Sequence, residues 1–290
     1  MNQGWKKSVL LKKLYRYCFN IFIRPCLISF TKNTVEKRPP IVINSFPKSG
    51  THLLTQIISA LPNYTDRGNF LASTPSVTLR VKSPSTMRRL LLRLLPGEIS
   101  SAHLHFSPEA REAIQKRSIC HLFIYRDPRD VCISEAHYLA SMNKFHRLHK
   151  YVKKEPGIES KINLTINGFY KNGFFGFIYP RIDKRFSLYE DWISDPNTLP
   201  IRYEDLIGDN QKDQIEKIAK FLFERNVIIE SEIDSFVRLA QSSISPENSH
   251  TFRSGQTNQW ITGFSEQQKL AFSLFGEDLI KRLNYRPTLK

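Results

Sequence analysis

A short polar turn between a strand and a helix is the feature that most constrains this chain. Residues 45–51 read Ser-Phe-Pro-Lys-Ser-Gly-Thr after an apolar run over 41–43, and apolar residues follow at helical spacing (Leu53, Leu54, Ile57 and Ile58). This pattern predicts a strand that turns directly into a helix. The first turn of a helix has unpaired backbone N–H groups and the positive end of the helix dipole, and Lys48 adds an ammonium group. An anion, most simply a phosphate, is therefore expected at this turn.

The turn is not a Walker A loop. That loop needs a glycine, four residues and then Gly-Lys-Ser/Thr, whereas here Lys48 precedes Gly50 and the upstream glycine is missing. An ordinary ATPase is therefore disfavoured, although a nucleotide-like ligand is still expected. Among enzymes, a P-loop kinase that uses ATP is the alternative, and it would depend on magnesium.

A second strand-turn-helix unit follows downstream. The apolar run over 119–125 leads into Arg-Asp-Pro-Arg-Asp at 126–130, and helical spacing continues from Val131. Another strand is expected over 199–203, and helices over 211–224, 230–240 and 265–283. Units of this kind stack into a parallel sheet with ligands at the carboxyl ends of the strands. With 290 residues, no linker and no internal repeat, the chain is predicted to form one α/β domain.

Phe46 to Thr51 resemble the 5'-phosphosulfate-binding loop of sulfotransferases that use 3'-phosphoadenosine 5'-phosphosulfate (PAPS), with the pattern Tyr-Pro-Lys-Ser-Gly-Thr-Thr-Trp. His52 and Leu53 stand where that pattern ends in Thr-Trp. The resemblance implies a cytoplasmic transferase with a P-loop-like domain, in which helices flank a central parallel sheet. It also implies that the loop holds the 5' end of the nucleotide through Lys48, Ser49, Gly50, Thr51 and His52.

Further patches are similar to the same family, in the same order along the chain. Arg126 at the end of a strand and Ser134 on the next helix match the pair that binds the 3'-phosphate, and both can reach one phosphate group. Three other matches imply contacts with the nucleotide: Tyr203 in Tyr-Glu-Asp-Leu, the pair Ser235 and Phe236, and the segment Arg253, Ser254 and Gly255 with Trp260 five residues later.

The transfer reaction requires a base, since a hydroxyl or amine loses a proton as it attacks sulfur, and histidine has the most suitable pKa. Of the eight histidines, the resemblance selects His103 in Ser-Ala-His-Leu, where the family has Lys-Thr-His-Leu-Pro, and His105 is the second choice. The implied mechanism is in-line transfer, with Lys48 neutralising charge on the oxygen that bridges sulfur and the 5'-phosphate. No metal is expected, because a sulfuryl group carries less negative charge than a phosphoryl group.

The first 36 residues are expected to form a basic amphipathic extension, followed by a sulfotransferase domain over 37–290. Apolar residues of the extension share one helical face, and most of its Lys and Arg residues lie on the other. Docking on the domain surface and peripheral association with an anionic membrane both fit this pattern. A membrane span does not fit, because Arg24-Pro25 ends the apolar run well short of roughly 20 residues.

The net charge of +16 predicts an electropositive surface. A nucleic-acid-binding protein is the alternative that charge suggests, but no zinc-finger, RNP or helix-turn-helix pattern supports it, so nucleic acid is not an expected partner. Basic segments over 80–95 and 144–154 are expected to border the acceptor, and their charge favours a glycan or a membrane-bound lipid. The four cysteines form no Cys-x-x-Cys pair, which indicates neither a metal site nor a disulfide framework and favours a reducing compartment.

Overall fold

A central parallel sheet organises the fold. The computed structural model describes residues 22–24, 26–27, 38–173, 176–245 and 255–289. The sheet has the strand order β2-β3-β1-β4-β7, with the bounds β1 Ile41–Ser45, β2 Thr65–Ala72, β3 Glu98–His103, β4 Cys120–Tyr125 and β7 Thr198–Arg202. All four neighbouring pairs are parallel. The predicted α/β class with helices around a parallel sheet is therefore confirmed.

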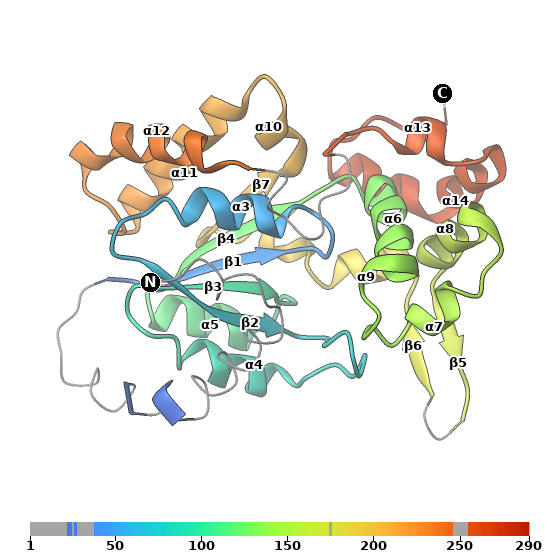
Figure 1. Ribbon diagram of the computed structural model, residues 1–290, viewed down its shortest axis with the longest axis horizontal. Helices are drawn as coiled ribbons and strands as arrows, with labels where there is room; N and C mark the ends of the chain where they lie inside the picture. Colours follow the sequence, from blue (N-terminus) through green and yellow to red (C-terminus); the bar gives the residue numbers. More distant parts are fainter. Residues whose placement is uncertain (1–21, 25, 28–37, 174–175, 246–254, 290) are drawn as a thin grey trace, which may run out of the picture.

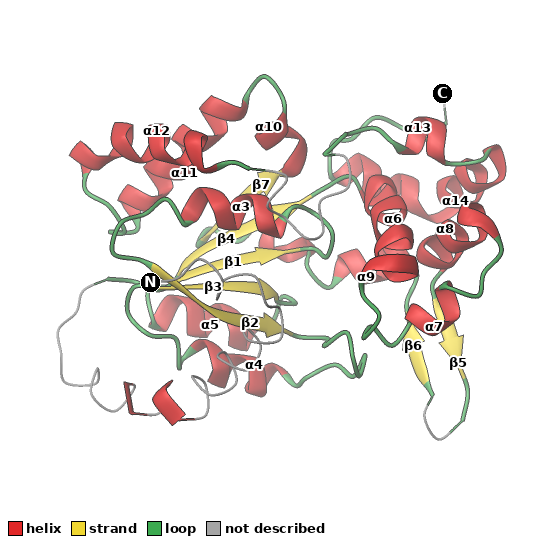
Figure 2. Ribbon diagram, in the orientation of Figure 1, coloured by secondary structure: helices red, strands yellow, loops and turns green. Residues whose placement is uncertain are grey.

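Helices cover both faces of this sheet (Figure 2). One face packs against α3 Thr51–Ile58, α11 Gln211–Glu224 and α12 Ile233–Ser243, and the other against α4 Pro84–Leu91 and α5 Pro108–Lys116. Every residue of β1 and β4 is buried, as expected for central strands of a covered parallel sheet.

A largely helical half lies beyond the carboxyl ends of the strands (Figure 1). Its longer helices are α6 Pro128–His137, α8 Gly157–Asn167, α9 Ile182–Ser187 and α14 Glu266–Arg282. The short hairpin of β5 Phe169–Lys171 and β6 Phe177–Tyr179 projects from this half beside α7 His149–Val152. The remaining elements are the π-helix η3 Tyr138–Met142, the 3₁₀ turns η4 Glu190–Trp192 and η5 Glu230–Glu232, and the helices α10 Tyr203–Ile207 and α13 Trp260–Gly263.

Several predicted elements are found with little change. β1 contains the apolar run predicted as a strand, α11 has the expected bounds, and β4 and β7 are each shifted by one residue or less at either end. The predicted last helix is α14, whose N-cap Ser265 and Gln268 form a capping box. Tyr203, expected as the last residue of a strand, is instead the first residue of α10. β2 and β3 were not predicted.

Candidate active site

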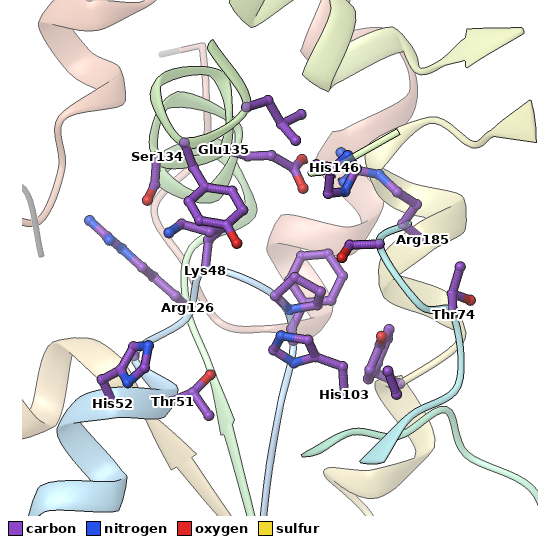
Figure 3. A pocket seen from close by; sticks show the side chains of 18 of the residues that line it. Lys48, Thr51, His52, Thr74, His103, Arg126, Ser134, Glu135, His146 and Arg185 are labelled. Carbon is purple, nitrogen blue, oxygen red and sulfur yellow. Dashed lines mark hydrogen bonds and ion pairs between the residues drawn. The ribbon is translucent and has the colours of Figure 1, made fainter. Parts of the chain in front are cut away.

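A cavity of about 1130 Å³ opens at the carboxyl ends of the strands, where ligands bind in sheets of this kind. Its walls come from residues 46–53, the ends of β2 and β3 with the 74–82 segment, Arg126 after β4, the C-terminal part of α6, and segments of the helical half. Lys48, His103 and Arg126 all line it (Figure 3). The residues predicted to hold the two ends of a nucleotide and the predicted base are therefore brought to one cavity.

The turn between β1 and α3 depends on Gly50. This residue is the N-cap of α3 and has φ of 100°, in the left-handed region that glycine adopts at little cost. A Cβ atom at this position would lie 2.5 Å from Cδ2 of Tyr203. Because glycine has no side chain to cap the helix, the first N–H groups of α3 remain available to an anion at the cavity.

Two side chains of the same loop suit an anionic ligand. The Lys48 ammonium lies 4.0 Å from the centre of the Tyr138 ring, in a cation–π contact, and both residues line the cavity. The Ser49 hydroxyl is buried without a hydrogen-bond partner within the described structure. A buried hydroxyl of this kind is unfavourable until a ligand or water satisfies it.

Arg126 reaches the cavity from the turn between β4 and α6. Its Nη2 donates to Asp130 Oδ2 (3.1 Å) and to the carbonyl oxygen of Gln256 (2.6 Å), and its guanidinium lies 4.6 Å from the centre of the Tyr203 ring. Its Nε is buried without a partner among the described residues. Ser134, which lies eight positions after Arg126 on α6, also lines the cavity.

The other charged residues of this turn pair with one another or cap α6 instead of lining the cavity. Arg129 is fully buried, pairs with Asp127 at 2.7 Å, and lies 3.7 Å from the centre of the Trp260 ring. Asp127 also caps α6 by accepting a bond from the Arg129 backbone N–H. Only Arg126 of the five residues 126–130 faces the cavity.

His103 ends β3 with its ring fixed by the neighbouring strand. Its Nδ1 lies 3.0 Å from the carbonyl oxygen of Ser45 and 3.0 Å from the Ser45 hydroxyl. A carbonyl oxygen only accepts, so Nδ1 carries the proton and Nε2 keeps its lone pair. Burial, aided by the positive charge of Lys48, lowers the pKa of His103 to about 4. The imidazole is therefore neutral at pH 7 and able to accept a proton.

His105, the second choice as base, also lines the cavity. Its Nε2 lies 3.4 Å from the Thr74 hydroxyl, and its ring packs edge-on against Tyr189 with the ring centres 4.9 Å apart. Burial lowers the pKa of His105 to about 4 as well. The two histidines therefore differ in their contacts rather than in charge state.

Some of the other residues predicted to contact the nucleotide line the cavity, and others do not. Tyr203 and Gly255 line the cavity, and the Tyr203 hydroxyl donates to the Gly255 carbonyl oxygen at 3.4 Å. Thr51 and His52 line it too. In contrast, the Ser235 hydroxyl donates to the Glu232 carbonyl oxygen, and Phe236 is buried in the core against α3 and α11, so neither lines the cavity. Arg253 and Ser254 lie outside the described residues.

A largely buried polar cluster that was not predicted lies on the far side of the cavity and is made of Glu135, Tyr179, Arg185 and His146 (Figure 3 labels all but Tyr179). Arg185 pairs with Glu135 at 2.5 Å and donates to the Thr165 carbonyl oxygen, and the Tyr179 hydroxyl bonds to both members of the pair. Burial lowers the pKa of His146 to about 4. No local sequence pattern could have revealed these contacts, because Glu135 and Arg185 are 50 positions apart.

Comparison with known proteins identifies the family. Residues 38–284 match the family model described as the sulfotransferase domain. The chain is a member of the sulfotransferase family. It is thus a transferase, and the family predicted from the 46–51 loop and the later patches is confirmed.

Three known proteins resemble this sulfotransferase over most of their length. Sulfotransferase 6B1 of Danio rerio is 23% identical over 267 residues, which cover 88% of this chain and 84% of the relative. Mouse sulfotransferase SULT7A1, solved in complex with PAP, has a TM-score of 0.57 and 20% identity, covering 88% of this chain and 89% of its own. A retinol dehydratase solved with androsterone and inactive cofactor PAP has a TM-score of 0.56 and 16% identity, covering 86% and 83%.

The structural matches establish that this sulfotransferase shares the fold of those two proteins. Within the part of the chain that the structure describes, none of the helices combines the length and apolar character needed to cross a bilayer.

Proposed function

We propose that this sulfotransferase moves a sulfuryl group from PAPS to a hydroxyl (or amine) acceptor, with His103 as the base and Lys48 stabilising the leaving oxygen. The observation that carries the proposal is that Lys48, Arg126 and His103 line a single cavity. The two similar proteins described above were solved in complex with PAP (3'-phosphoadenosine 5'-phosphate), which supports the choice of nucleotide.

The residues of the cavity fit an adenosine bisphosphate. The N-terminus of α3 and the Lys48 ammonium would hold the 5' end, whereas the buried Ser49 hydroxyl does not line the cavity. Arg126, whose Nε lacks a partner among the described residues, and Ser134 would hold the 3'-phosphate. Three apolar side chains that also line the cavity would accept the adenine (Leu53, Ile207 and Ile244).

His103 and Lys48 have complementary roles in the proposed step. The acceptor oxygen forms a bond to sulfur while the bond from sulfur to the bridging oxygen breaks, and Nε2 of His103 takes the acceptor proton. The Lys48 ammonium stabilises the negative charge that develops on the departing oxygen. The Ser45 carbonyl oxygen, which accepts from Nδ1, stabilises the imidazolium formed by this proton transfer.

A transfer assay tests the proposal. PAPS with labelled sulfur is incubated with a panel of phenols, aliphatic alcohols, amines and lipids, and labelled product is measured for the wild type, His103→Ala and His105→Ala. We expect His103→Ala to lose about 10²–10⁴-fold in rate with PAP affinity retained, as is usual for loss of a general base, and His105→Ala to lose much less. A larger loss in His105→Ala would transfer the role of base to that residue, and no transfer from PAPS to any acceptor would reject the proposed reaction.

A further inference from the structure

The cavity opens through a surface made of three segments, which we call the mouth surface: residues 76–82, residues 143–149, and the β5–β6 hairpin. Arg147 joins all three. Its backbone N–H donates to the Ser76 carbonyl oxygen (2.9 Å), its Nη1 donates to the Thr78 carbonyl oxygen (2.8 Å), and its guanidinium lies 4.8 Å from the centre of the Phe177 ring on β6. The three segments therefore form one continuous surface, which lies beside α7 in Figure 1.

Exposed apolar side chains surround this opening. Val77, Val81 and Ile178 line the cavity and yet are 62%, 66% and 63% exposed. Tyr170, which pairs with Ile178 across the hairpin, is 63% exposed on the same hairpin face. The opposite hairpin face is occupied, because Phe169 and Phe177 pack with Tyr151. The hairpin thus buries one apolar face and presents a second at the cavity entrance, where exposed apolar patches often mark an interaction site.

The mouth surface is also strongly basic. Its three segments contain Arg80, Lys82, Lys144, Arg147 and Lys171 and no Asp or Glu, which gives them a formal charge of +5. Arg80 and Lys144 are exposed, and so is Lys150 directly after the second segment. The entrance is therefore positively charged, and none of its three segments carries an acidic residue.

We propose that the mouth surface docks on an anionic lipid bilayer and that the acceptor is a membrane-resident amphiphile whose hydroxyl enters the cavity from the lipid side. This inference rests on the function proposed above. Exposed basic residues gain from the negative surface potential of such a bilayer, and the aliphatic side chains between them gain by insertion into its interface. A sulfated glycan would satisfy the charges but offers no apolar partner for Val77, Val81 and Ile178.

Vesicle binding by the full-length protein tests this docking. Co-sedimentation is measured with vesicles of phosphatidylcholine and of phosphatidylcholine mixed with phosphatidylserine, for the wild type and Arg80→Glu/Lys144→Glu/Lys150→Glu. The matched control is Lys212→Glu/Lys217→Glu/Lys220→Glu, which reverses three exposed charges on α11 at the other end of the molecule. All proteins keep the N-terminal extension, so any binding by the extension is common to them.

We expect binding to the mixed vesicles only, reduced about tenfold or more in the mouth variant and little changed in the control. An additional variant, Val77→Ser/Tyr170→Ser, should weaken vesicle binding without weakening binding to heparin. Equal loss in the mouth variant and the control would overturn the inference. Heparin binding without vesicle binding would also overturn it and would favour a polyanionic glycan.

A second readout concerns the acceptor. With labelled PAPS and mixed vesicles that contain a hydroxylated amphiphile, labelled sulfate should appear in the lipid fraction, and less of it with the mouth variant. PAP binding, measured by calorimetry, distinguishes failure of the membrane inference from failure of the proposed function. If PAP binds but the mouth variant sediments and sulfates like the wild type, only the membrane inference fails. If PAP does not bind, the proposed function fails.

Discussion

His103 is held as a neutral imidazole whose Nε2 is free of the proton. Since burial lowers the pKa of His103 to about 4, the pH profile of kcat/KM should be flat from about pH 8 to pH 6. The rate should fall only in more acidic solution, as imidazolium forms. A fall with a midpoint near pH 6.5, the ordinary value for histidine, would contradict the environment described for this ring.

The buried pair of Glu135 and Arg185 leads to a second prediction at this scale. Removal of one partner leaves an uncompensated buried charge, so Glu135→Gln should lower the free energy of unfolding by about 3–5 kcal/mol, measured by urea denaturation. The matched control is Glu112→Gln, whose exposed pair with Arg88 should contribute little. Similar losses in both variants would mean that the Glu135 pair is solvated like a surface pair.

For single residues, the local sequence pattern predicted the location of some cavity residues but not of others. Lys48 and Arg126 each follow a strand and precede a helix, so their place at the edge of the sheet follows from the local sequence. His103 required the family resemblance, because one histidine in an otherwise unremarkable stretch has no local signal. The partners of Glu135 come from positions 44 and 50 residues away, and only the packed fold brings them together.

At the scale of elements, the junction of β1 and α3 makes the strongest prediction. Gly50→Ala adds a Cβ that would lie 2.5 Å from the Tyr203 ring, in addition to the cost of φ near 100° for alanine. The control is Gly173→Ala, with nearly the same φ of 97°; apart from its chain neighbours, no described residue has a heavy atom within 4 Å of the added Cβ. Both variants should lose about 1–3 kcal/mol for the strained backbone, but only Gly50→Ala should also lose PAP affinity. Equal PAP affinity in the two would show that the junction does not hold the nucleotide.

The elements that the sequence revealed are those with clear hydrophobic patterns. β1 and β4 are apolar because both faces of the sheet are covered, and α11 has one apolar face. β2 is an edge strand with one buried residue, and it begins with Thr-Asp-Arg-Gly-Asn, which resembles a loop. β3 is polar for a structural reason, since buried Glu98 on it binds Arg24. Such strands are recognised only from their neighbours in the sheet.

For the whole molecule, buried histidines predict sensitivity to acid. Burial lowers the pKa of His121 to about 3, below its ordinary 6.5. As pH falls below 6.5 the unfolded chain binds the proton first, so the free energy of unfolding should fall by about 1.4 kcal/mol per pH unit for this group. Urea denaturation between pH 7 and pH 5 should therefore show a smaller slope for His121→Gln than for the wild type. Identical slopes would mean that His121 is protonated alike in both states.

The whole-molecule feature that matters most for function is that one cavity collects side chains from the ends of all five strands of the sheet and from the helical half. The fold class follows from the repeated strand-turn-helix pattern. The shape of the cavity and its mouth does not, because it depends on how the hairpin, α6 and the 76–82 segment pack together. If one ligand contacts both Lys48 and Arg126, the packed fold must place these two residues at the same cavity.

Calorimetric titration with PAP, and with ATP for comparison, tests the central claim most directly. The wild type should bind PAP more tightly than ATP, and Lys48→Ala and Arg126→Ala should each weaken PAP binding by about tenfold or more, as loss of a charge-assisted hydrogen bond implies. Lys217→Ala, on the distant α11, should bind PAP like the wild type. PAP binding that is unchanged in both site variants, or tighter binding of ATP, would contradict the claim that these two residues hold the ends of one adenosine bisphosphate.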